Sequence, residues 1–103
     1  MEGMELICFQ IIASVGSARS SYIEAIRNAR EGNIEEAKKA IAQGDEEFQT
    51  AHKAHGELIT KEAAGDKTDV SLLLLHAEDQ LMSAETIKIV AEEFIELCKK
   101  VIK

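Results

Sequence analysis

The chain has no proline and no tryptophan, and aromatic residues make up only 4% of its 103 residues. Without proline, no residue forces a kink in a helix, and the abundant Ala, Glu, Lys, Leu and Ile residues favour long helices. The hydrophobic core must therefore consist mainly of aliphatic side chains. A chain of this length forms one domain, residues 1–103, whose stability is marginal unless its core is well packed or shared by assembly.

Basic charge is also scarce, because the net charge is -7 and no run of Lys and Arg occurs. This balance argues against nucleic acid and anionic membranes as partners. No apolar run approaches the roughly 20 residues that a membrane span needs, and the N-terminus lacks the basic region and cleavage site of a signal peptide. We therefore expect a cytoplasmic protein with no direct membrane insertion.

Cysteine is limited to two residues, Cys8 and Cys98, near opposite ends of the chain. They lack the spacing of a metal site and lie among apolar residues. They could form a disulfide only if the first and last helices placed them side by side. We expect two buried free thiols, as is usual in a cytoplasmic protein.

Apolar residues recur at alternating intervals of three and four over three segments, near 5–31, 34–63 and from 70 almost to the C-terminus. This spacing predicts an all-α fold, an antiparallel three-helix bundle. At 1.5 Å per residue, each helix would span about 40–50 Å. Such a rod has a thin core, which favours side-by-side association of chains.

Glycine and capping residues mark the breaks between the helices. Gly32 can end the first helix in the left-handed conformation, and Asn33 can cap the second. Thr68 or Asp69 can cap the third. Gly16 lies inside the first helix, where a glycine lowers helix stability by up to about 1 kcal/mol relative to alanine. Either this loss is tolerated, or the glycine allows another backbone to approach closely.

His52 and His55 lie three residues apart on the predicted apolar side of the second helix. A pair at this spacing could bind a metal ion, but no cysteine or further histidine joins it. Histidines hydrogen-bonded to a neighbouring helix are the favoured alternative.

The third helix carries two apolar stripes. The main stripe is predicted to face the core: Leu73, Ala77, Gln80, Ala84, Ile87, Ala91, Phe94, Cys98 and Val101. A second stripe is predicted for its N-terminal half alone, with charged residues such as Lys88 solvated beyond it: Leu72, Leu75, His76, Asp79, Met82 and Ser83. One helix of a small monomer does not bury apolar side chains on so many of its faces, so we expect a second burial surface between protomers.

His76 and Asp79 share one face of this helix because they are three residues apart. Three interpretations stay open on the residues alone: an Asp-oriented histidine that acts as nucleophile or base, a metal-binding pair, or a polar contact at an oligomer interface. A carboxylate among apolar residues needs a partner in each case. The sequence has no phosphate-binding glycine loop, no nucleophile elbow and no zinc pattern.

The segment from Val70 to Met82, VSLLLLHAEDQLM, resembles the signature VSL-x-L-x-HAQDHLM of the lactose/cellobiose-type IIA components of the bacterial phosphoenolpyruvate-dependent sugar phosphotransferase system. The segment from Ile11 to Ser20 resembles the family's II-x-S-G-x-ARS motif, and Gly32 falls at the family's first turn. The resemblance covers nearly the whole chain in one register.

The resemblance implies that His76 accepts a phosphoryl group on its tele nitrogen from the phosphocarrier protein HPr and passes it to a cysteine of the cognate IIB component. The pathway would serve uptake of a lactose/cellobiose-type disaccharide. It further implies a homotrimer of nine helices, in which three copies of Asp79 surround one Mg²⁺ on the three-fold axis.

Two residues depart from the family pattern: Glu78 stands where the family usually has Gln, and Gln80 where it often has His. Both are expected to support the site and to be tolerated, because neither is the phosphoryl acceptor. The alternative function is a regulatory or scaffolding homotrimer that keeps the bundle without phosphoryl turnover.

Overall fold

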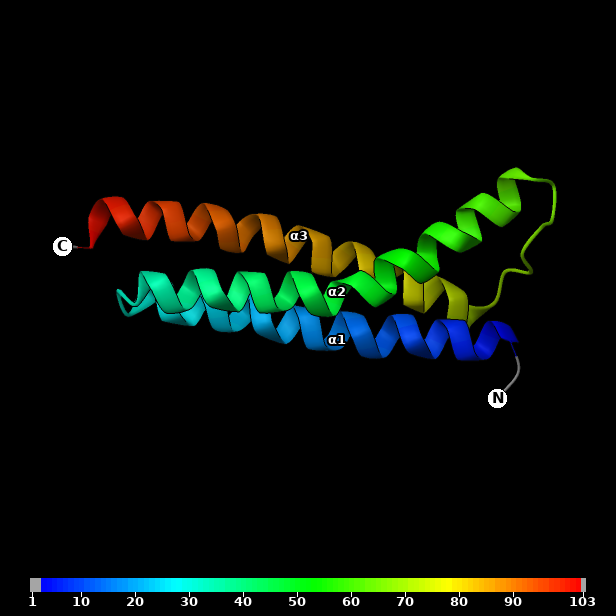
Figure 1. Cartoon of the computed structure of the whole chain (residues 1–103), viewed down its shortest axis with the longest axis horizontal. Coiled ribbons are helices and arrows are strands. Elements are labelled where there is room, and N and C mark those ends of the chain that lie inside the picture. Colours follow the sequence, from blue (N-terminus) through cyan, green and yellow to red (C-terminus); the bar gives the residue numbers. More distant parts are fainter. Residues whose placement is uncertain (1–2, 103) are drawn as a thin grey trace.

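The protein, as a computed structural model that describes residues 3–102, consists of three α-helices: α1 (Gly3–Arg30), α2 (Ile34–Ala63) and α3 (Leu72–Val101). Successive helices run antiparallel and form a rod of 54 × 25 × 20 Å (Figure 1). The predicted all-α three-helix architecture is therefore confirmed for these residues.

Helix α1 is the centre of the bundle and packs along most of its length against both other helices, which contact each other far less. Its buried residues follow the predicted spacing: Cys8, Ile11, Val15, Ala18, Tyr22, Ala25 and Ala29. By length and composition alone α1 could also cross a membrane, a test that the core helix of a folded bundle passes as well. Gly16 faces solvent, and a Cβ atom there would meet nothing within 4 Å. Within residues 3–102, no backbone segment approaches it closely.

The helix ends agree only partly with prediction. Gly32 adopts the left-handed conformation, with φ of +83°, and follows the end of α1 as expected. Asn33 precedes α2, but its side chain makes no capping hydrogen bond. The cap of α3 is Ser71, whose Oγ accepts a hydrogen bond from the Leu74 backbone N–H at 3.1 Å. Ser71 takes this role from Thr68 and Asp69 because the chain stays non-helical through residue 71.

Helix α2 changes direction near its middle, and its C-terminal half rises away from α1 (Figure 1). The side chain of Ser14 in α1 lies at this point. Its hydroxyl donates to the Glu47 carbonyl oxygen at 2.5 Å and accepts from the Ala51 N–H at 3.2 Å. In a straight helix these two backbone groups bond to each other, and a hydroxyl inserted between them is a recognised cause of bending.

Helix α3 buries a stripe close to the predicted one: Leu74, Ala77, Leu81, Ala84, Ala91, Ile95 and Cys98. The second stripe is longer than predicted. Beyond Met82, the side chains of Ile89 and Leu97 are 61% and 54% exposed, so the apolar face continues into the C-terminal half. The prediction that this stripe is confined to the N-terminal half was therefore wrong.

Cys8 and Cys98 are both buried free thiols, as predicted. They belong to separate parts of the core. Cys8 packs near the start of α3 with Leu74 and Ala77, and Cys98 packs at the other end of the rod with Ala29. The thiols are consequently too far apart to form a disulfide within one chain.

Candidate functional site

His76 is exposed in the second turn of α3, where it borders a shallow hollow lined by Leu72 and Leu73. The Ser71 cap fixes the start of the helix and therefore the direction in which this imidazole projects. An exposed imidazole can present a ring nitrogen to a reactant on another protein, which a buried one cannot.

Asp79 lies one turn further along α3 and is also exposed. Its neighbours on the same face are apolar: Leu75 is 56% exposed, Met82 is 59% exposed, and Leu72, at the start of the helix, is 84% exposed. Within residues 3–102, no three His, Cys, Asp or Glu side chains are grouped so that they could hold a metal ion. One chain thus supplies a single carboxylate in an outward-facing apolar stripe.

Glu78 projects from α3 toward α2. One of its carboxylate oxygens lies 2.9 Å from Nδ1 of His55, and the two side chains are 32% and 27% exposed. The favoured prediction for His55, a hydrogen bond to a neighbouring helix, is confirmed. His52 is exposed and contacts the ring of Phe48, so its predicted place on the apolar side was wrong. Gln80 is half-buried.

The thiol of Cys8 also lies within the electrostatic reach of Glu78. Burial raises the pKa of the Cys8 thiol, and the negative charge of Glu78 raises it further. Cys8 belongs to α1, so Glu78 is directed toward the inside of the bundle, where α1 and α2 meet α3.

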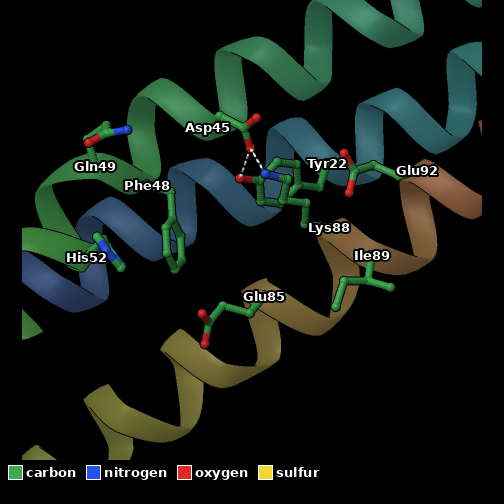
Figure 2. Close-up of a pocket in the computed structure, with 9 residues that line it drawn as sticks. All are labelled: Tyr22, Asp45, Phe48, Gln49, His52, Glu85, Lys88, Ile89 and Glu92. Carbon is green, nitrogen blue, oxygen red and sulfur yellow. Dashed lines mark hydrogen bonds and ion pairs between the residues drawn. The ribbon is translucent and has the colours of Figure 1, made fainter.

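A cavity of about 440 Å³ lies between the three helices in the middle of the rod, and Figure 2 shows the side chains around it. On one wall, Asp45 of α2 accepts a hydrogen bond from the Tyr22 hydroxyl at 2.7 Å and pairs with Lys88 Nζ at 2.9 Å. One carboxylate thereby joins all three helices. Lys88 had been expected in the solvated surface, and this contact corrects that prediction.

The Tyr22–Asp45–Lys88 contact alters the acidity of two groups. Burial, the hydrogen bond to Asp45 and nearby carboxylates raise the pKa of the Tyr22 phenol. The hydrogen bond to Asp45 raises the pKa of Lys88 despite partial burial. Sequence reasoning missed this contact, although a lone tyrosine on an apolar stripe signals that its hydroxyl needs a partner.

The cavity is separate from His76. Along α3, Glu85 is the first residue that lines it, and from His76 to Glu85 the helix rises by roughly 13 Å. The Tyr22–Asp45–Lys88 contact therefore serves the stability of the bundle. The candidate chemistry remains at the start of α3, with His76 and Asp79.

The sequence profile described as "PTS system, Lactose/Cellobiose specific IIA subunit" matches residues 6–99. The lichenan-specific phosphotransferase enzyme IIA component of Bacillus subtilis is 49% identical over 97% of this chain and 91% of its own length. The lactose-specific IIA component of Streptococcus mutans is 37% identical over 96% of this chain and 95% of its own. The crystal structure of the cellobiose-specific enzyme IIA from Bacillus anthracis superposes with a TM-score of 0.93 at 46% identity, covering 98% of this chain and 93% of the other.

Proposed function

Because the chain belongs to the lactose/cellobiose-specific IIA family of the sugar phosphotransferase system, we propose that it is a cytoplasmic phosphoryl carrier whose acceptor is His76. HPr is the donor, and a cysteine of the cognate IIB component is the recipient. The relay serves uptake of a lactose/cellobiose-type disaccharide. The observation that carries the proposal is the exposure of His76 at the edge of an apolar face.

The first transfer exchanges one nitrogen–phosphorus bond for another. The lone pair of the His76 Nε2 atom attacks phosphorus on the phosphohistidine of HPr, the N–P bond of HPr breaks, and the His76 ring passes its proton to the HPr ring. In the second transfer the sulfur of the IIB cysteine attacks phosphorus on His76, an S–P bond forms, the Nε2–P bond of His76 breaks, and the thiol proton returns to the His76 ring. Such transfers need positioning and charge stabilisation more than covalent machinery, so a small bundle is sufficient when each partner completes the site.

We propose that three copies assemble through the exposed stripe of α3. Leu72, Leu75 and Met82 would be removed from water there, and each fully buried side chain of this kind contributes roughly 1.5–3 kcal/mol. Three protomers supply nine such side chains. This gain offsets the cost of bringing three Asp79 carboxylates together, provided that a cation accompanies them.

Asp79 fits one Mg²⁺ on the axis of this trimer, since its exposed carboxylate stands among apolar side chains, and residues 3–102 of one chain bring no three metal-binding side chains together. Carboxylate oxygens are the ligands that this hard cation prefers. When bound, the ion neutralises the three carboxylates and stabilises the assembly. We expect Mg²⁺ to raise the melting temperature of the wild-type protein at fixed concentration. An Asp79→Asn variant that kept the same response would refute this role.

Incubation with phosphoenolpyruvate, enzyme I, HPr and this chain tests the carrier function. The wild-type chain should gain one phosphate that is labile in acid and stable in base, and His76→Ala should gain none. His52→Ala, at another exposed histidine, is the matched control and should be phosphorylated like wild type. A wild-type chain that takes up no phosphate would instead support the regulatory or scaffolding alternative.

A further inference from the structure

The contact between His55 and Glu78 links the bent half of α2 to the helix that carries His76. The two atoms that meet are Nδ1 of His55 and Oε1 of Glu78, 2.9 Å apart. Both side chains are about two-thirds shielded from solvent. Nearby charges are screened less at such a site than on an open surface.

Glu78 lies close to the proposed phosphoryl acceptor along the chain but faces another direction. Residues two apart on a helix are about 200° apart around the axis and about 3 Å apart along it. His76 therefore projects to solvent while Glu78 projects toward α2. The carboxylate does not compete for the space of the phosphoryl group, yet its charge acts on that group across the helix.

The position of His55 depends on the bend in α2. Ser14 bridges Glu47 and Ala51, one turn before His55, and redirects the helix at that point. The bend and the His55–Glu78 contact form a continuous set of contacts from α1 through α2 to α3. The geometry accounts for the direction of the Glu78 side chain without any contact to His76.

We propose that His55 is a positioning residue for phosphoryl transfer, which holds Glu78 in place and balances its charge, so that His76 can carry a dianionic phosphoryl group without an unpaired carboxylate nearby. This inference rests on the proposed carrier function. In this proposal, His55 compensates for the negative charge of Glu78 at a position where the residue pattern of the family has an uncharged glutamine.

A double-variant cycle tests the proposal by measuring the equilibrium constant for phosphoryl exchange between HPr and this chain. His55→Gln should lower the constant by about two- to tenfold, the range expected for one unpaired charge at this separation. Adding Glu78→Gln to His55→Gln should restore it, because no charge is then left to balance. His52→Gln, one turn earlier and exposed, is the matched control and should leave the constant unchanged.

Restoration by Glu78→Gln separates charge balance from a merely structural contact, because a lost contact would not be regained when its second partner is also removed. A His55→Gln constant equal to wild type, or a double variant as low as His55→Gln, would overturn the inference while the carrier function stands. A wild-type chain that accepts no phosphate would overturn both.

Discussion

The three histidines of the chain differ in their surroundings. His52 is exposed beside Phe48, His55 is engaged by Glu78, and His76 is exposed at the border of the apolar stripe of α3. A nucleophilic imidazole must offer a free lone pair to phosphorus. The side chain of His55 is only 27% exposed, which limits the access of a reactant on another protein. Exposure therefore favours His76 and His52 over His55, and the sequence motif around His76 is what favours it over His52.

Gly44 gives a stability prediction at the residue scale. A Cβ atom at this position would overlap the ring of Tyr22, which is fully buried. Gly44→Ala should therefore lower the free energy of unfolding by about 1–3 kcal/mol, as other overpacked cores do. Gly56→Ala is the control in the same helix, because a Cβ atom there meets nothing within 4 Å. It should raise the free energy by up to about 1 kcal/mol. Equal effects in urea denaturation would contradict the packing described for Tyr22.

Tyr22 gives a prediction about alkaline pH. Its pKa in the folded chain is raised, first by burial and then by Asp45, so the unfolded chain loses this proton before the folded chain does. The stabilising contribution is complete below the ordinary tyrosine pKa of about 10 and is lost as pH rises through the folded pKa. In that window the phenol should reduce the free energy of unfolding by about 1.4 kcal/mol per pH unit.

The measurement is direct because Tyr22 is the single tyrosine of a chain without tryptophan. The ultraviolet absorbance of phenolate should appear together with unfolding, and Tyr22→Phe should have a shallower loss of stability above pH 10. A phenol that ionises at its ordinary pKa while the helices remain intact would contradict its burial and its bond to Asp45.

At the scale of the elements, features that depend on one helix's own sequence were predicted, and features that depend on contacts between helices were not. The spacing of the buried stripe of α1 was predicted correctly, because a central helix buries one continuous face. Ala51 replaces His52 in the buried face of α2, since the bend there is set by Ser14 from another helix. The cap at Ser71 likewise depends on where the connection becomes helical, which short sequence patterns do not specify.

Ser14→Ala tests the cause of the bend in α2. Without the hydroxyl, the Ala51 N–H can bond to the Glu47 carbonyl oxygen, so α2 should straighten and His55 should move away from Glu78. Two hydrogen bonds are lost and one is regained, which predicts a net loss of about 1 kcal/mol. Residual dipolar couplings of the α2 amides should then fit one helix axis, while the wild type and the exposed control Ser17→Ala should each need two. A bend that persists in Ser14→Ala would exclude this cause.

At the scale of the whole molecule, one chain leaves a long apolar face uncovered on a thin rod. The face includes Leu72, Leu75, Met82, Ile89 and Leu97, each more than half exposed. The two apolar stripes of α3 could be recognised from the sequence, but the length of the second could not, because acidic residues interrupt it in the C-terminal half. The proposed assembly through this face would explain why a small chain with a net charge of -7 keeps so much apolar surface.

Leu75→Glu tests the assembly. A charge on the proposed interface should convert trimers to monomers in analytical ultracentrifugation at micromolar concentration, because three carboxylates would be buried without partners. Ala42→Glu introduces the same side chain at an exposed position of α2 outside the stripe and should leave the trimer intact. A monomeric wild type, or a trimer unaffected by Leu75→Glu, would show that the stripe is not the interface.

The most direct test of the account is to locate the phosphate on the chain after enzymatic phosphorylation. Peptide mapping by mass spectrometry under alkaline conditions, which preserve phosphohistidine, distinguishes the three histidines. The wild-type chain should carry one phosphate, attached to Nε2 of His76, and none on His52 or His55. Phosphate on another residue, or a fully phosphorylated His76→Ala variant, would contradict it.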